Sequence, residues 1–188
     1  MNVWLIAAMS ADGKIAQAEG QSSLDWTSKE DTHFFISKTK EAGVVIMGRK
    51  TFDTIGKPLK GRRIFVMTRR PLPASPLQGE ENTSLPPLTK GGPGGVGVAG
   101  TVEYTNLSPR DLLDQLATQG VTTVAIAGGS SIYSQFLQDG LVTDLYLTIE
   151  PHLFGSGVPL ATGFERIDMK LVDVTPLNNQ AVLLHYKI

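Results

Sequence analysis

The sequence contains no cysteine, and this absence excludes several kinds of chemistry. Without thiols the chain has no disulfide framework, no thiolate nucleophile and no cysteine-ligated metal site. The three histidines, at positions 33, 152 and 185, do not have the spacing of a metal-ligand pair. We therefore expect no metal site, and we expect each histidine to be a surface or packing residue.

An excess of charge of one sign is also lacking. The 17 lysines and arginines nearly balance the 18 acidic residues, so the net charge of -1 gives no global reason to bind nucleic acid or an anionic membrane. No apolar run reaches membrane-spanning length, and the N-terminus has neither the charged region nor the long apolar stretch of a signal peptide. We expect a soluble, cytoplasmic protein whose partner is a small molecule; the oligomeric state stays open.

Short apolar runs alternate along the chain with segments of helical spacing. A chain of 188 residues with 41% hydrophobic content can bury one core, so we expect one domain over residues 1–188. Near-continuous apolar runs are typical of strands in a sheet that is covered on both faces. The predicted strands are 3–9, 43–47, 64–67, 123–127 and 143–149, and the predicted helices are 28–41, 108–119 and 130–138.

Two late apolar runs, 170–174 and 181–186, have only turn residues between them and predict a hairpin. The sequence therefore predicts a single-domain α/β fold, with a mostly parallel central sheet flanked by helices and an antiparallel hairpin at the C-terminal end. Residues 71–97 depart from the pattern because they are rich in proline, glycine and small polar residues. We expect a flexible surface insertion without catalytic duty there, with a functional lid as the alternative.

One candidate site lies at the start of the helix predicted over 28–41. Asp31 lies in the first turn, and phenylalanines three and four residues further on share its helical face. A carboxyl buried against aromatic rings has its pKa raised above about 3.9 and can donate a proton. The segment alone fits better an acid that complements the helix dipole.

A second candidate site follows two predicted strands. Gly48 and the pair Gly128–Gly129 each come after a strand and before a helix, where small residues allow a helix N-terminus to approach a pyrophosphate. The usual dinucleotide fingerprint, Gly-x-Gly-x-x-Gly, is absent. Cationic and hydroxyl side chains after two neighbouring strands suit the extra phosphate of NADPH, so we expect NADPH and not NADH. The set consists of Arg49, Lys50, Thr68, Arg69 and Arg70. Each feature alone is equally explained by a solvated charged turn or a tight connection.

Several motifs occur together, in one order, over nearly the whole chain apart from the insertion. They are Ala7-Ala8-Met9 with Asp12 and Ile15, Trp26 followed by Asp31, Met47-Gly48-Arg49-Lys50-Thr51-Phe52, Ile55-Gly56-Lys57-Pro58-Leu59-Lys60-Gly61-Arg62, Ala127-Gly128-Gly129 before Ile132-Tyr133, and Leu145-Tyr146-Leu147-Thr148. In this order the motifs resemble dihydrofolate reductase. The resemblance implies that fold and the NADPH-dependent reduction of 7,8-dihydrofolate to 5,6,7,8-tetrahydrofolate, in which a carbon receives a hydride and the neighbouring nitrogen a proton.

The resemblance also implies roles for individual residues. Asp31 would pair with the pterin and assist its protonation, Thr148 would support Asp31, and Trp26 would help to hold a water near the proton route. With Trp26 and Thr148 added, a proton site is preferred over the helix-dipole role of Asp31. Arg62 would take the carboxylate of the aryl tail. The implied substrate-binding residues are Ile6, Ala8, Asp31, Phe35, Ile55, Leu59, Arg62, Ala127, Tyr133 and Thr148. The implied cofactor-binding residues are Ala8, Ile15, Gly48, Arg49, Lys50, Thr51, Thr68, Arg69, Gly128, Gly129, Ser130, Ser131 and Ile132.

Two alternatives stay open. The stretches 9–16 and 150–157 are at least as similar to the reductase domain of riboflavin biosynthesis, a relative with the same fold. A stand-alone reductase of that type would act on a ribosylaminopyrimidine phosphate. The other alternative is a non-catalytic nucleotide-binding module that keeps the fold. The stretch 16–25 is longer and more polar than is usual in dihydrofolate reductases, which leaves its closure over the site open.

Overall fold

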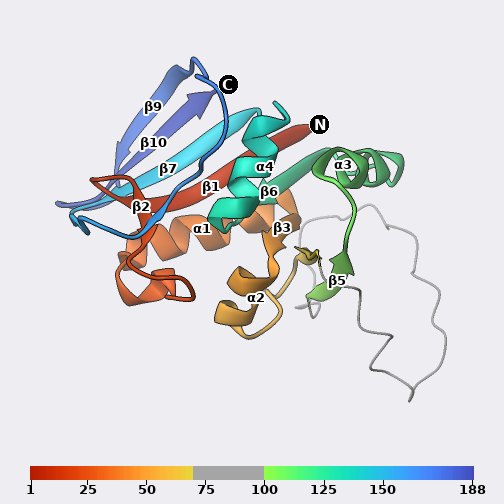
Figure 1. The fold of residues 1–188 in the computed structure, drawn as a ribbon, viewed down its shortest axis with the longest axis horizontal. Coiled ribbons are helices and arrows are strands. Elements are labelled where there is room, and N and C mark those ends of the chain that lie inside the picture. Colours follow the sequence, from red (N-terminus) through yellow and green to blue (C-terminus); the bar gives the residue numbers. More distant parts are fainter. Residues whose placement is uncertain (70–99) are drawn as a thin grey trace.

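The computed structural model describes residues 1–69 and 100–188, and its centre is an eight-stranded sheet in the order β5-β4-β3-β6-β1-β7-β10-β9 (Figure 1). The strands are β1 (Asn2–Ser10), β3 (Val44–Gly48), β4 (Arg63–Met67), β5 (Thr101–Thr105), β6 (Thr123–Ile126), β7 (Asp144–Glu150), β9 (Lys170–Pro176) and β10 (Val182–Lys187). All pairs from β5 to β7 are parallel, whereas β10 is antiparallel to both β7 and β9. The predicted α/β fold class, with its antiparallel C-terminal hairpin, is confirmed.

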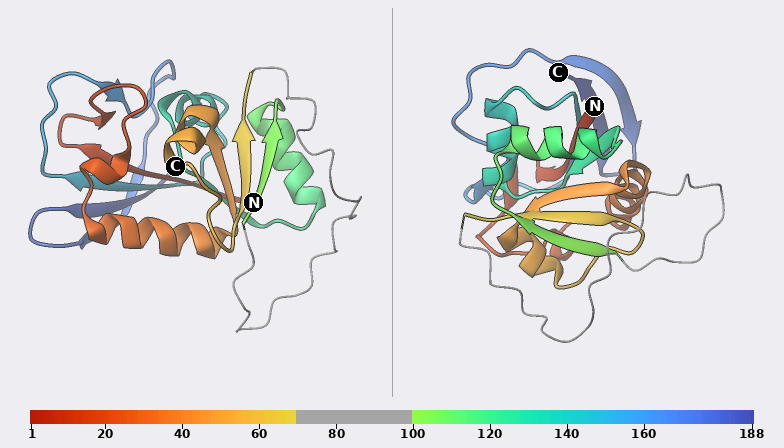
Figure 2. Two further views of the ribbon diagram at one scale, coloured as in Figure 1. Left: turned by 90° about the horizontal axis from the view of Figure 1, so that it is seen from below. Right: turned by 90° about the vertical axis from the view of Figure 1, so that its right-hand side faces the viewer.

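Helices cover both faces of the sheet (Figure 2). They are α1 (Lys29–Ala42), α2 (Arg49–Ile55), α3 (Pro109–Thr118) and α4 (Ser130–Gln138), and a short 3-10 turn, η1, spans Ser23–Asp25. On one face Leu5 packs in a cluster with Phe136 of α4 and with α3. On the other face, Met47 packs with Phe52 of α2 and Phe35 of α1. Successive residues of a strand point to opposite faces, so an almost wholly apolar strand is what this two-sided burial requires.

The observed ends of the elements differ from the predicted ones for local reasons. The strand predicted from residue 43 begins at Val44, because Gly43 has φ of 73° and ends α1. The strand predicted over 123–127 ends at Ile126. Strand β5 was missed because only Thr105 of it is buried. The pair β2 (Lys14–Ala16) and β8 (Val158–Pro159), which forms a separate antiparallel sheet, is too short for a periodic signal.

The expected flexible insertion over 71–97 lies outside the described residues, as does Arg70. Within the described part of the chain, the helices lack the length and apolar character needed to cross a membrane. The carboxyl ends of the parallel strands meet at one edge of the sheet, which is where ligands bind in open α/β sheets. The pair β2–β8 lies beside this edge and is held by a close backbone approach.

We predict that this approach tolerates no side chain at Gly157. Its φ is 140°, and a Cβ there would lie 2.2 Å from the carbonyl oxygen of Ala16. Gly155 is the matched control, because its φ is 72° but an added Cβ meets nothing within 4 Å. Gly155→Ala should lower the free energy of unfolding by about 1–2 kcal/mol through backbone strain alone, and Gly157→Ala by clearly more. Denaturant unfolding measures both, and equal losses would contradict the close approach.

Candidate active site

A cavity of about 1500 Å³ opens at the carboxyl ends of β1, β3 and β6. Its wall carries nearly all of the residues that the sequence analysis proposed. They are Ile6, Ala8, Ile15, Asp31, Phe35, Gly48, Arg49, Lys50, Thr51, Ile55, Leu59, Arg62, Thr68, Arg69, Ala127, Gly128, Gly129, Ser130, Ser131, Ile132 and Tyr133. Trp26 and Thr148 do not line the cavity. Thr148 lies next to Ala8 of the wall, and Trp26 lies against His152 and Phe154.

Asp31 is the one buried acid on the wall of this cavity in the described chain, with 9% of its surface exposed. Burial raises the pKa of its carboxyl above the ordinary aspartate value, and the negative charge of Glu150 adds to the rise. Hydrogen bonds from Thr148 and Thr27 act in the opposite direction. The helix-capping role belongs to Ser28, whose Oγ accepts the Asp31 N–H at 3.2 Å. The Asp31 carboxyl is therefore available to a ligand.

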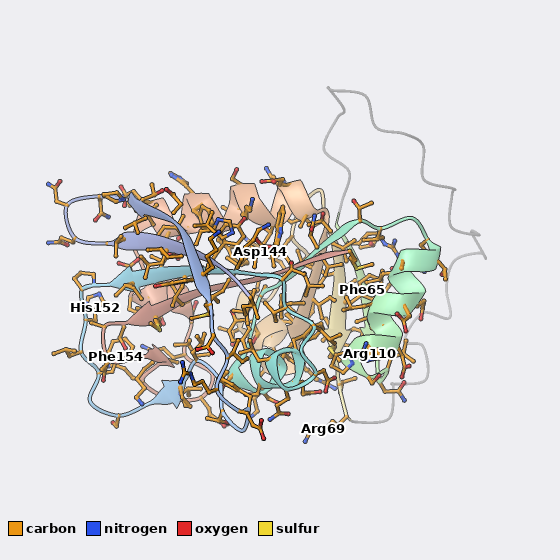
Figure 3. All side chains as sticks on the ribbon, turned by 90° about the horizontal axis from the view of Figure 1, so that it is seen from above. Phe65, Arg69, Arg110, Asp144, His152 and Phe154 are labelled. Atoms are coloured by element: carbon orange, nitrogen blue, oxygen red, sulfur yellow. The ribbon has the colours of Figure 1, made fainter. Side chains whose placement is uncertain are left out.

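Thr148 contacts Asp31 directly, whereas Trp26 packs against residues 152–154. Thr148 is 1% exposed and lies on β7 opposite Ala8 of β1, so its hydroxyl reaches Asp31 from the sheet. The indole of Trp26 packs edge-on against Phe154 with ring centroids 5.1 Å apart. The backbone carbonyl oxygen of Trp26 lies 3.1 Å from Nε2 of His152. Figure 3 shows His152 and Phe154 together at one end of the molecule. The indole Nε1 is buried and has no hydrogen-bond partner among the described residues.

The outer end of the cavity carries positive charge. Arg62 is 7% exposed, its Nη1 donates to Oγ1 of Thr39 at 2.7 Å, and its Nε donates to the carbonyl of Lys60 at 3.3 Å. Burial lowers the pKa of Arg62, and no acidic side chain of the described residues forms an ion pair with it. A buried guanidinium without a counter-ion is costly, so this position favours an anionic ligand. Lys40 and Lys57 also line this end, with Lys60.

The other half of the cavity has the shape of a phosphate cradle. A Cβ at Gly48 would lie 3.1 Å from Cγ1 of Ile132, and a Cβ at Gly129 would lie 3.1 Å from Oγ1 of Thr51. Gly129 is the N-cap of α4 and brings no side chain to that end of the helix, and Ser130 and Ser131 of the first turn line the cavity. Both glycines thus keep open a space beside a helix N-terminus, which fits a dinucleotide pyrophosphate.

The cations near this cradle differ in their partners. Arg49 lies 3.7 Å from Asp53, and Lys50 forms an ion pair with Glu19. Glu19 belongs to the polar stretch 16–25, most of which lines the cavity. Arg69 also lies on the wall and has no acidic partner among the described residues. Of the three charged side chains, Arg69 is therefore the one whose charge is not already offset.

Several residues of the site were missed by the sequence analysis. Thr27 has no signal beyond its place next to Trp26, and lysines such as Lys40 and Lys57 are common on any surface. Glu150 lies one residue beyond the end of the predicted strand 143–149 but within β7, two residues after Thr148, so both side chains lie on the same face.

The family to which the chain belongs is shown by comparison with known proteins. The sequence profile described as RibD C-terminal domain matches residues 2–183, so the chain belongs to that family. The uncharacterized protein YwjB of Bacillus subtilis (strain 168) is 24% identical over 190 residues, covering 97% of this chain and 95% of that protein. Dihydrofolate reductase HdrB of Haloferax volcanii is 29% identical over 149 residues, covering 77% of this chain and 63% of that protein.

Solved structures show the same fold. A putative riboflavin biosynthesis protein from Shewanella sp. PV-4 has a TM-score of 0.72 at 20% identity, covering 100% of this chain and 98% of that one. The diaminohydroxyphosphoribosylaminopyrimidine deaminase/5-amino-6-(5-phosphoribosylamino)uracil reductase from Thermotoga maritima has a TM-score of 0.74 at 18% identity, covering 99% of this chain and 56% of that one. Dihydrofolate reductase from Enterococcus faecalis, complexed with NADP(H), has a TM-score of 0.60 at 20% identity, covering 99% and 95%.

These comparisons refine the resemblance found in the sequence. They confirm a reductase family with the dihydrofolate reductase-like fold, but not dihydrofolate reductase as the particular enzyme. They support the riboflavin-type alternative better, because the family profile is that of the RibD C-terminal domain.

We predict that Asp31→Asn stabilises the protein at neutral and alkaline pH. The pKa of Asp31 is raised in the folded chain, so between the unfolded pKa and the folded pKa the folded state binds more protons, and stability falls as pH rises. Asparagine does not ionise and escapes this loss. The melting temperature of the variant should exceed that of the wild type at pH 8 and approach it near pH 4, with roughly 2–4 °C for each kcal/mol in a chain of this size. A difference independent of pH would contradict the raised pKa.

Proposed function

We propose that the protein is an NADPH-dependent reductase of a heterocyclic substrate with an anionic tail, and that the first candidate substrate is a ribosylaminopyrimidine phosphate of the riboflavin pathway. The observation that carries the proposal is one cavity that holds three features: a buried carboxyl at Asp31, a buried guanidinium at Arg62 with no acidic partner among the described residues, and a glycine-lined cradle at Gly48 and Gly129. This combination suits a reaction that needs a proton, a bound anion and a dinucleotide together.

In the proposed reaction, different residues hold the proton, orient its donor and exclude water. NADPH, when bound, supplies the hydride. Asp31 holds the proton that must follow it to a neighbouring heteroatom, which is an oxygen when a ribose ring is opened and a nitrogen when a dihydropterin is reduced. Thr148 fixes the carboxyl of Asp31, and the buried Nε1 of Trp26 offers a donor to a water beside it. The apolar wall of Ile6, Phe35 and Ile55 keeps other water away.

The tail of the substrate is the point at which the two candidate substrates differ. Arg62 together with Lys40, Lys57 and Lys60 supports a phosphate, which carries up to two negative charges. The family of the chain supports the same choice. The second candidate, 7,8-dihydrofolate, is favoured by a different observation: Phe35, Ile55 and Leu59 form an apolar wall that suits an aryl group before a carboxylate.

The experiment that tests the proposal offers purified protein NADPH with each compound in parallel and follows the loss of nicotinamide absorbance and the mass of the product. We expect the ribosylaminopyrimidine phosphate to have the higher kcat/KM. Reduction of dihydrofolate alone would establish the second candidate. If the protein binds NADPH but neither compound oxidises it, the proposed reductase activity is wrong. The alternative of a non-catalytic nucleotide-binding module would then be favoured.

Loss of the acid should be costly for catalysis. Asp31→Asn keeps the shape of the side chain but removes its proton, and we expect kcat/KM to fall about 10²- to 10⁴-fold at neutral pH. The deficit should shrink at low pH, where solvent protonates the substrate. Glu30→Gln is the control, because Glu30 is exposed and its carboxylate accepts from Asn178 at 3.0 Å. An Asp31→Asn enzyme with most of its activity would leave Asp31 with a structural role only.

Choice of cofactor should depend most on Arg69. A charge-assisted contact contributes roughly 1.5–3 kcal/mol, so Arg69→Gln should weaken NADPH about ten- to a hundred-fold and NADH little. Arg110→Gln on α3 is the control, because Arg110 is exposed, does not line the cavity and donates to the carbonyl of Asp139 (Figure 3). Nicotinamide fluorescence measures binding of both cofactors. Equal losses for NADPH and NADH would show that Arg69 does not contact the extra phosphate.

A further inference from the structure

A second buried carboxyl lies close to Asp31 and has no part in the function proposed above. Glu150, at the end of β7, is 2% exposed. One of its oxygens, Oε1, accepts both the backbone N–H and the hydroxyl of Ser28, each at 2.8 Å. Both donors to this oxygen come from Ser28. The buried carboxyl is thus held at the start of α1 by a specific pair of hydrogen bonds.

Ser28 connects this carboxylate to the proposed proton donor. It is the N-cap of α1, and its Oγ donates to Glu150 while accepting the N–H of Asp31 at 3.2 Å. Thr148, two residues before Glu150 on the same face of β7, holds the carboxyl of Asp31 itself. Strand β7 therefore contacts the first turn of α1 at two points, through the hydroxyl of Thr148 and through the carboxyl of Glu150.

Few other charged groups lie near the carboxyls of Asp31 and Glu150 in the described chain. Asp31 is faced by the hydroxyls of Thr27 and Thr148, by the charge of Glu150 and by the buried phenol of Tyr133 on α4. Its neighbour Glu30 is exposed and directed to Asn178. No lysine, arginine or histidine of the described residues forms an ion pair with Glu150. A negative charge at Glu150 opposes the ionisation of Asp31, and no ion pair of the described residues offsets it.

We propose that Glu150 is a positioning residue for Asp31: through Ser28 it fixes the turn that carries Asp31, and it sets a second carboxyl beside that of Asp31. The effect on rate rests on the proposed function, but the effect on the titration of Asp31 does not. Glu150→Gln tests the charge, because an amide oxygen still accepts from Ser28 while the charge is gone. Glu150→Asp keeps the charge and changes only the reach.

The direct measurement is an NMR titration of the Asp31 side-chain carboxyl carbon in the protein without cofactor or substrate. In Glu150→Gln the midpoint should move to lower pH, and in Glu150→Asp it should stay closer to that of the wild type. Glu30→Gln, which removes a neighbouring but exposed charge, should move the midpoint less. A purely structural role would change the melting temperature and leave the midpoint in place, which would overturn the proposal.

The rate supplies a second readout if the protein reduces either candidate substrate. Each unit by which the midpoint falls lowers the protonated fraction at higher pH about tenfold. We expect the kcat of Glu150→Gln to fall about three- to ten-fold at pH 8 and to stay within about two-fold at pH 5. Should Glu150→Gln not fold, Glu150→Met removes the charge with an apolar side chain of similar length, and the Asp31 midpoint should again move to lower pH. A midpoint that stays in place in that folded variant would overturn the role of the charge. Failure of the reductase assay with a shifted NMR midpoint would reject the function and not this inference.

Discussion

The contact between the carboxyl end of β7 and the first turn of α1 is the constraint on which the site depends. The pairing of β1 with β7 runs from Trp4–Asp144 to Ser10–Glu150, and this register sets Ala8 of the cavity wall beside Thr148. A slip of one residue would turn Thr148 and Glu150 to the opposite face of the sheet. Asp31 would then lose the hydroxyl that holds it and the charge that acts on it. Sheet register is thus a condition for the chemistry as well as for the core.

Two ionisable side chains of opposite sign are buried at the two ends of one cavity. Neither Asp31 nor Arg62 has an ion-pair partner among the described residues, and the burial of each disfavours its charged form. Folding alone gives no reason to retain such groups, because apolar side chains of similar size would cost less. A ligand with a group to be protonated at one end and an anion at the other offsets both costs. The unfavourable burial is therefore itself evidence for the kind of molecule that the cavity accepts.

The sequence was informative where a local rule decides the structure. Apolar runs located the inner strands, and Ser28 and Ser108 fixed the starts of α1 and α3 within one residue, because each accepts the N–H three residues further on. The sequence could not reveal β5, whose side chains are mostly not buried, or the contact of Asp31 with Thr148, which only the resemblance implied. The contact of Glu150 with Ser28 could not be predicted either, because two residues 122 positions apart leave no local pattern in the sequence.

If the proposed function holds, the end of the cavity that Arg62 lines distinguishes the two candidate substrates, and the two kinds of cation there act differently. Arg62 is held by Thr39 and Lys60, so its planar fork would bind carboxylate and phosphate alike. Lys40, Lys57 and Lys60 are exposed, and exposed charges contribute modestly and are screened by salt. A phosphate concentrates up to two charges on one group, whereas the tail of dihydrofolate spreads its charge over separate carboxylates, so a preference for phosphate would come from the lysines. That preference should weaken as ionic strength rises, whereas binding of either anion through Arg62 persists.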